Sequence, residues 1–198
     1  MRANLLQQML KFDKNWAILG CPRSGTHYTE RFFRLAGFSF LHERLGKNGG
    51  CGWNLVLEDL SACDFVFHQV RHPRDCIYRV GCRWDAKTQG KMDKEAGTWN
   101  MPVFGIGRGV EFWVRWNLLC EGKSLFTFQV EDLNPGSVTA RKLQDVIGFP
   151  DRQFPELPKN VASANKRLEV TREMALQHCP DFAPKAFALA EKYGYVWE

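Results

Sequence analysis

The sequence predicts one α/β domain in which helices cover both faces of a central, mainly parallel sheet. Short apolar runs alternate with segments of helical periodicity, and glycine or proline marks the end of several runs. The 198 residues are about the length of one domain, 44% of them are hydrophobic, and no repeat or low-complexity linker divides the chain. We therefore expect a single three-layer domain, residues 1–198, that contains a P-loop-like strand–loop–helix.

Strands and helices are expected in largely alternating order. The first pair is a strand at 16–20 (WAILG) and a helix at 24–36, which stops at Gly37. The other strands are expected at 38–41, 65–70 and 126–130, and the other helices at 4–11, 53–60, 75–84, 111–121, 137–147 and 181–193.

Three segments are expected to be irregular. Segments 42–52 and 85–109 are rich in glycine and weakly patterned, and 150–167 contains prolines. We expect 85–109 to be a mobile part of an active site. Ligands of parallel sheets bind beyond the carboxyl ends of the strands, so the loops at 20–26, 42–52 and 71–75 are expected to meet at one edge.

Charge and cysteine content narrow the classes of partner. The chain has 27 basic and 22 acidic residues, and this excess favours an anionic ligand. The basic residues are scattered, which disfavours nucleic acid. Seven cysteines without a C-x-x-C pair predict neither a disulfide framework nor a zinc site. No stretch reaches membrane-spanning length and the N-terminus has no secretory pattern, so we expect a cytoplasmic protein with no membrane partner.

The segment 20–26 (GCPRSGT) has the composition of a phosphate-binding loop. Gly25 permits close approach of the backbone to a ligand, and the N-terminus of the following helix offers free N–H groups. Ser24 and Thr26 add hydroxyl groups, and Arg23 adds a forked cation. The alternative is a plain strand-to-helix turn in which a hydroxyl caps the helix, although such a turn has no use for the arginine.

Two related phosphate-binding motifs do not fit this loop. In the Walker pattern G-x-x-x-x-G-K-[ST], Thr26 replaces the lysine and His27 replaces the hydroxyl residue. A cysteine phosphatase starting at Cys21 would need arginine where His27 stands. The sequence therefore predicts a phosphate site without the usual metal apparatus, and no metal ion is expected.

Several segments together resemble the P-loop sulfotransferases, which take the sulfuryl group from 3′-phosphoadenosine 5′-phosphosulfate (PAPS). The order and spacing of the segments are similar to a bacterial and viral subgroup of small sulfotransferases. The segments are C-P-R-S-G-T at 21–26, G-F-S-F-L-H-E-R-L-G-K-N-G at 37–49, H-Q-V-R-H-P-R-D at 68–75, F-W-V-R-W-N at 112–117 and Q-V-E-D-L at 129–133.

The resemblance implies that the glycine loop holds the 5′-phosphosulfate. Arg23 would contact the 5′-phosphate and the bridging oxygen, on which negative charge develops as the bond breaks. Ser24, Gly25, Thr26 and His27 would complete the cradle.

The resemblance also implies a 3′-phosphate site at the second motif. Arg71 would bind this phosphate by charge-assisted hydrogen bonds. Where the family has a serine eight residues later, this chain has Arg79, which either contacts the same anion or points into solvent.

The attacking hydroxyl needs a general base, and two residues after the second strand are candidates. The resemblance favours Glu43, with His42 second. The alternatives are a solvated Glu43 paired with Arg44 or Lys47, and a His42 that only packs or caps. His68 lies inside an apolar strand, so a structural role is expected for it.

These observations leave three functions open. The first is a PAPS-dependent sulfotransferase acting on a hydroxyl of a small-molecule or carbohydrate acceptor. The second is a P-loop kinase of a nucleoside or small metabolite, which would need ATP and magnesium. The third is a nucleotide-binding module without activity.

Overall fold

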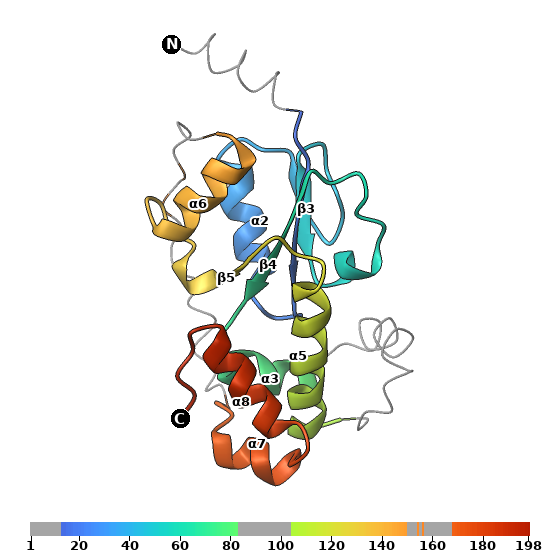
Figure 1. The fold of residues 1–198 in the computed structure, drawn as a ribbon, viewed down its shortest axis with the longest axis vertical. Coiled ribbons are helices and arrows are strands. Elements are labelled where there is room, and N and C mark those ends of the chain that lie inside the picture. The colour runs from blue at the N-terminus through green and yellow to red at the C-terminus, as the bar shows by residue number, and fades with distance from the viewer. Residues whose placement is uncertain (1–12, 83–103, 150–153, 155, 157–167) are drawn as a thin grey trace. The chain divides into compact units, whose positions relative to one another are not determined.

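The computed structural model describes residues 13–82, 104–149, 154, 156 and 168–198. The described elements (Figure 1) are strands β1 (Trp16–Gly20), β2 (Phe40–His42), β3 (Gly49–Gly52), β4 (Phe65–Val70) and β5 (Thr127–Gln129), α-helices α2 (Thr26–Leu35), α3 (Pro73–Cys82), α5 (Ile106–Glu121), α6 (Val138–Ile147), α7 (Arg172–His178) and α8 (Ala183–Lys192), and 3₁₀ turns η1 (Asn54–Leu57) and η3 (Val130–Asp132). The expected helix at 4–11 lies outside the described residues.

The chain forms two compact units. The first comprises Met1–Val70 and Leu119–Ala164 and contains the sheet. The second comprises Arg71–Leu118 and Asn165–Glu198, and its described elements are helices. Each unit is described below by itself.

The sheet of the first unit has five parallel strands in the order β2-β3-β1-β4-β5. Together with the flanking helices it confirms the expected α/β class. The chain leaves β1 through α2 toward β2 on one side, and β4 pairs with β1 on the other. The carboxyl end of β1 is therefore a switch point of the sheet, where α/β proteins place their ligands.

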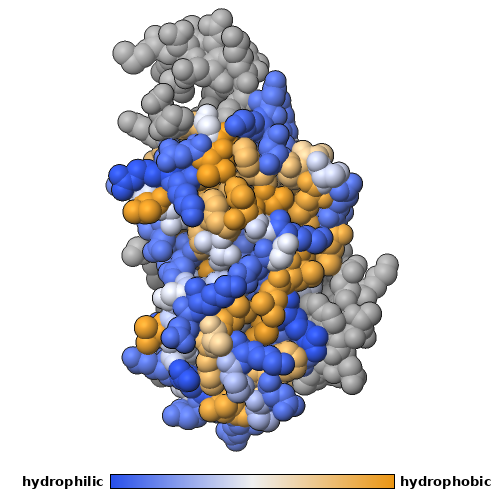
Figure 2. Space-filling model, in the orientation of Figure 1, coloured by the Kyte–Doolittle hydropathy of each residue, from blue (hydrophilic) through white to orange (hydrophobic). Residues whose placement is uncertain are grey.

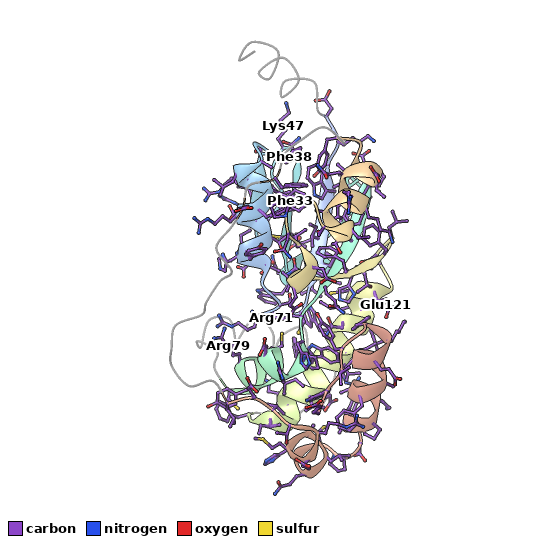
Figure 3. The ribbon with its side chains drawn as sticks, turned by 90° about the vertical axis from the view of Figure 1, so that its left-hand side faces the viewer. Phe33, Phe38, Lys47, Arg71, Arg79 and Glu121 are labelled. Atoms are coloured by element: carbon purple, nitrogen blue, oxygen red, sulfur yellow. The ribbon has the colours of Figure 1, made fainter. Side chains whose placement is uncertain are left out.

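Aromatic side chains fill the core of the first unit on one face of the sheet. Trp16 of β1 is fully buried, and its ring lies 5.6 Å from that of Phe33, 5.1 Å from that of Phe38 and 5.4 Å from that of Phe40. Figure 3 labels Phe33 and Phe38 in this region. Residues of α6 such as Leu143 belong to the same core, so α2 and α6 cover this face.

His68, inside β4, has the structural role expected for it. The side chain is fully buried, and its Nδ1 shares a 3.1 Å hydrogen bond with the hydroxyl of Thr127 on the adjacent β5. The histidine therefore links the two strands.

The expectation that 42–52 is entirely a loop is wrong, because Gly49–Gly52 forms strand β3. A methyl group on Gly49 would lie 1.8 Å from the backbone oxygen of Trp16, and one on Gly50 would lie 2.0 Å from that of Arg44. Only glycine allows neighbouring backbone to come so close. The glycines that indicated a loop are therefore what allows a central strand to fit here.

Residues 85–103 of the loop expected at 85–109 lie outside the described residues, and the end of that expected loop is wrong, because α5 begins at Ile106 rather than at 111. Glycine has a low helix propensity, and for this reason the sequence pattern did not predict the first turn of α5. Both helical glycines are crowded, since a methyl group on Gly107 would lie 2.4 Å from the His178 oxygen and one on Gly109 would lie 2.2 Å from the Ile77 oxygen. Helix packing in the second unit explains their presence.

The remaining differences concern the ends and lengths of elements. The strand expected at 38–41 runs from Phe40 to His42, the strand expected at 126–130 gives way to a 3₁₀ turn at Val130, and the helix expected at 53–60 is a single 3₁₀ turn. Helix α7 was not expected from the sequence, although Thr171 caps it by accepting a 3.3 Å hydrogen bond from the Met174 N–H.

Apolar side chains also reach the surface. Figure 2 shows apolar and hydrophilic residues side by side on one face of the molecule. The most exposed large apolar side chains of the first unit include Leu125 and Val138. No helix of the described ranges combines the length and apolar character that crossing a bilayer requires.

Candidate functional site

The glycine loop lies between β1 and α2 at the switch point of the sheet. Gly25 is the N-cap of α2, has a φ of 93° and provides no side-chain cap. The first N–H groups of an α-helix have no acceptor within the helix, and the helix dipole makes this end partly positive. The loop therefore presents backbone donors that suit a phosphate or sulfate group.

Packing around Ser24 shows why the loop needs its glycines. Ser24 is fully buried, and a methyl group on Gly20 would lie 2.6 Å from its hydroxyl oxygen. That hydroxyl has no hydrogen-bond partner within the described structure. A buried, unpartnered hydroxyl in a loop of this kind is an available donor for a bound oxyanion.

The loops at 20–26 and 42–52 meet, as expected from the parallel sheet. The hydroxyl of Thr26 and Nε2 of His42 share a 2.9 Å hydrogen bond. The His42 ring also stacks on that of His27, with centroids 3.6 Å apart and planes inclined by 17°. The second candidate base is therefore attached to the first turn of α2.

The environment of His42 weakens it as a base. Burial and the nearby His27 lower its pKa to about 4, against a smaller opposite effect of Glu43. At neutral pH the ring is uncharged, and its basicity is close to that of an ordinary carboxylate. This favours a positioning role toward Thr26 over proton abstraction.

Glu43 is exposed and held by its neighbours. Its Oε1 accepts a 2.8 Å hydrogen bond from the indole N–H of Trp53, and its backbone oxygen accepts a 2.9 Å bond from the Asn54 amide. Its own N–H donates to the oxygen of Cys51 at 2.8 Å. The observed partner is thus an indole and not Arg44 or Lys47, the ion-pair partners considered from the sequence.

Arg23 and Glu43 share an unusual backbone conformation. They are the two non-glycine residues with positive φ in the described part of the chain, at 68° and 57°. This region costs an L-residue roughly 1 kcal/mol and is often occupied at functional sites. Two residues singled out from the sequence for their chemistry are therefore also the ones the backbone strains.

The second motif opens the second unit. Arg71 follows the last residue of β4 and contacts Asp75 through Nη2 and Oδ2 at 3.4 Å. Asp75 and Arg79 are one turn apart on α3, so the three side chains are spaced by four residues (Figure 3 labels both arginines). The chain therefore places an acidic residue between the two arginines proposed for the 3′-phosphate.

His72 anchors the start of α3 to the C-terminal segment. Its Nδ1 accepts a 3.3 Å hydrogen bond from the Arg74 N–H, which leaves Nε2 to donate to the Val196 oxygen at 2.9 Å. The ring also lies 5.0 Å from that of Tyr195. His72 thus has a structural role next to Arg71.

Sequence reasoning missed the residues that hold these loops. Gln69 is fully buried in β4, its Nε2 donates to the Ser24 oxygen at 2.7 Å, and its Oε1 accepts from the Thr29 hydroxyl. Trp53, which binds Glu43, was also missed. For Gln69 the sequence did contain a signal, because an amide inside an apolar strand must find a hydrogen-bond partner to offset the free-energy cost of its burial.

In the described part of the chain no three His, Cys, Asp or Glu side chains are grouped so as to hold a metal ion. Comparisons with protein-family models, with curated proteins and with solved structures find no match to this chain.

Proposed function

We propose that the protein is a PAPS-dependent sulfotransferase that transfers the sulfuryl group to a hydroxyl of a small molecule or carbohydrate. The observation that carries the proposal is the hydrogen bond between Thr26 and His42, which joins the phosphate-type loop to the segment bearing Glu43. A donor's 5′-phosphosulfate and an acceptor's hydroxyl need adjacent sites, and the proposal is supported by this contact between the two segments that would form them.

The loop offers the groups that the donor end of the reaction requires. Backbone N–H groups at the start of α2, the Ser24 hydroxyl and the exposed Arg23 guanidinium would bind the 5′-phosphosulfate. As the bond between sulfur and the bridging oxygen breaks, that oxygen keeps the electron pair and leaves with adenosine 3′,5′-bisphosphate. Arg23 would stabilise the charge that develops there.

Glu43 is proposed to accept the proton of the acceptor hydroxyl. The acceptor oxygen forms the new bond to sulfur, and its proton passes to the carboxylate. His42 would position Thr26 instead, because its pKa of about 4 removes the advantage of an imidazole at neutral pH. The indole of Trp53 fixes one carboxylate oxygen and leaves the other for the proton.

In this proposal Arg71 binds the 3′-phosphate of the donor, and Arg79 takes the place of the family's serine. Arg71, Asp75 and Arg79 follow one another at intervals of four residues, and Asp75 contacts the Arg71 guanidinium at 3.4 Å. This spacing supports a shared anion site in which Asp75 orients Arg71.

Thermal unfolding with two nucleotides tests the proposal. We expect adenosine 3′,5′-bisphosphate at millimolar concentration to raise the melting temperature in the absence of metal, and ATP with magnesium to have a smaller effect. Stabilisation by ATP and magnesium alone would instead support the kinase alternative. Binding of the bisphosphate without sulfuryl transfer from PAPS to any hydroxyl acceptor would support the module without activity.

A further inference from the structure

We propose that Gln69 is the positioning residue of the glycine loop, holding the Ser24 carbonyl inside the protein so that the Gly25 N–H faces the bound phosphate. The identity of the bound phosphate in this inference rests on the proposed function. The orientation of the loop peptide does not, and it can be tested without any ligand.

The Gln69 amide has both ends occupied. Its Nε2 donates to the Ser24 oxygen at 2.7 Å, and its Oε1 accepts from the Thr29 hydroxyl of α2. All three side chains are fully buried. A hydroxyl donor at Oε1 leaves Nε2 as the end that faces Ser24, so Thr29 fixes which way the amide points.

The peptide unit between Ser24 and Gly25 links the position of the Ser24 oxygen to the direction of the Gly25 N–H. The described chain has no cis peptide bonds, and in a trans peptide the C=O and the following N–H point in opposite directions. Holding the Ser24 oxygen against Gln69 therefore turns the Gly25 N–H away from Gln69. That N–H is at the amino end of α2, where the proposed phosphate binds.

The backbone on both sides of Ser24 has a conformation that needs support from neighbouring groups. The two neighbours of Ser24 both have positive φ, 68° for Arg23 and 93° for Gly25. An arginine rarely adopts this conformation, so the surrounding structure must stabilise it. The hydrogen bond to Gln69 falls on Ser24, the residue between these two positive-φ positions.

Packing limits other shapes of the loop. A methyl group on Gly20 would lie 2.6 Å from the Ser24 hydroxyl oxygen, and one on Gly25 would lie 3.2 Å from Cγ2 of Val130. Packing therefore restricts the loop at Gly20 and at Gly25. The Gln69 amide adds a hydrogen bond at Ser24, which lies between these two positions in the sequence.

Two substitutions of Gln69 and one matched control test the inference. Gln69→Glu keeps the shape and, measured at a pH high enough to ionise the carboxylate, removes the donor toward Ser24. Gln69→Leu removes both hydrogen bonds. Gln144→Leu removes a buried glutamine of α6 in the same unit and controls for lost stability. By calorimetry we expect both Gln69 variants to bind adenosine 3′,5′-bisphosphate about 10-fold or more weakly, and the control to bind normally.

The ¹⁵N–¹H signal of Gly25 provides a readout that needs no ligand. We expect this signal to move in both Gln69 variants and to stay in place in Gln144→Leu. If the Gln69 variants fold poorly, Thr29→Val keeps the volume and should shift the same signal by freeing the amide to rotate.

The outcomes separate the inference from the function. Wild-type affinity in Gln69→Glu together with an unchanged Gly25 signal would overturn the inference and leave the function intact. A wild type that does not bind the bisphosphate would overturn the function, while a Gly25 signal altered by Gln69→Glu would still support the inference.

Discussion

Two stacked imidazoles set the electrostatics of the candidate site at the scale of single residues. The rings of His27 and His42 are 3.6 Å apart, so a second positive charge on this pair is unfavourable. His42 is the half-buried member and has its pKa lowered to about 4. The His42 ring that shares a hydrogen bond with Thr26 is therefore uncharged at neutral pH.

This lowered pKa predicts a loss of stability in mild acid. In the unfolded chain His42 titrates near its ordinary value of 6.5, so between about pH 6.5 and pH 4 the unfolded state binds the extra proton. The contribution of His42 is therefore complete above pH 6.5 and declines as the pH falls to about 4. The free energy of unfolding, measured by urea denaturation across this range, should fall more in the wild type than in His42→Gln.

The ring signals of His42 give a direct check of that prediction. NMR titration should place the midpoint of the His42 ring near pH 4. A midpoint near 6.5 would contradict the burial and charge argument.

Glu43 should be needed for turnover and not for folding. Glu43→Gln keeps an oxygen that accepts the Trp53 N–H but removes the ability to take a proton. We expect sulfuryl transfer from PAPS to fall by about 10²–10⁴-fold with little change in melting temperature. Trp53→Phe is the companion variant, which removes the hydrogen bond to Glu43 and keeps the base, so turnover should fall less than in Glu43→Gln. Full turnover in Glu43→Gln would remove Glu43 from the mechanism.

The candidate residues could be predicted where their chemistry is visible in the chain. Arg23 and Gly25 are parts of a local motif, so their side-by-side placement follows from the sequence. Trp53 and Gln69 are different, because their partners Glu43 and Ser24 lie 10 and 45 residues away along the chain. Such pairs become visible only when strand register brings them together.

At the scale of elements, the glycines of β3 predict a sharp difference between two substitutions. Gly49 and Gly136 both have positive φ, but a methyl group on Gly49 would lie 1.8 Å from the Trp16 oxygen, whereas one on Gly136 meets nothing within 4 Å. Gly136→Ala should cost about 1 kcal/mol through its backbone conformation. Gly49→Ala should cost several times as much, because β3 must move away from β1.

Urea denaturation of both variants measures this difference. The wild-type slope with denaturant should be kept by Gly136→Ala. Equal losses of unfolding free energy in the two variants would mean that β3 is not paired with β1 as described.

Element prediction succeeded where pattern and packing agree. The runs at 16–20 and 65–70 are apolar and end at clear turn signals, and both are strands with the expected bounds. At Gly49–Gly52 the close approach of backbone overrides strand propensity, and at Ile106 the close packing of helices overrides helix propensity. These are tertiary effects that a single segment does not carry.

At the scale of the whole molecule, the seven cysteines predict insensitivity to reducing agents. All seven are free, and five of them are buried. The half-buried thiols are Cys63 and Cys82, and burial raises the pKa of both. Dithiothreitol should therefore leave the melting temperature unchanged. In native protein a thiol reagent should modify two groups slowly, and in guanidinium it should modify seven.

Mass spectrometry after alkylation checks which thiols react. Native labelling is expected at Cys63 and Cys82. Rapid native labelling of Cys51, whose thiol donates to the Thr26 oxygen at 3.0 Å, would contradict the packing of β3 against the start of α2.

The left-handed backbone at Arg23 has a consequence for anyone improving this protein in the laboratory. Glycine or asparagine would adopt that conformation at lower cost, so a screen for heat resistance alone should favour replacing the arginine. The variants selected for heat resistance would then lack the guanidinium that the proposed sulfuryl transfer needs. Selection for heat resistance and selection for activity should therefore favour different residues at position 23.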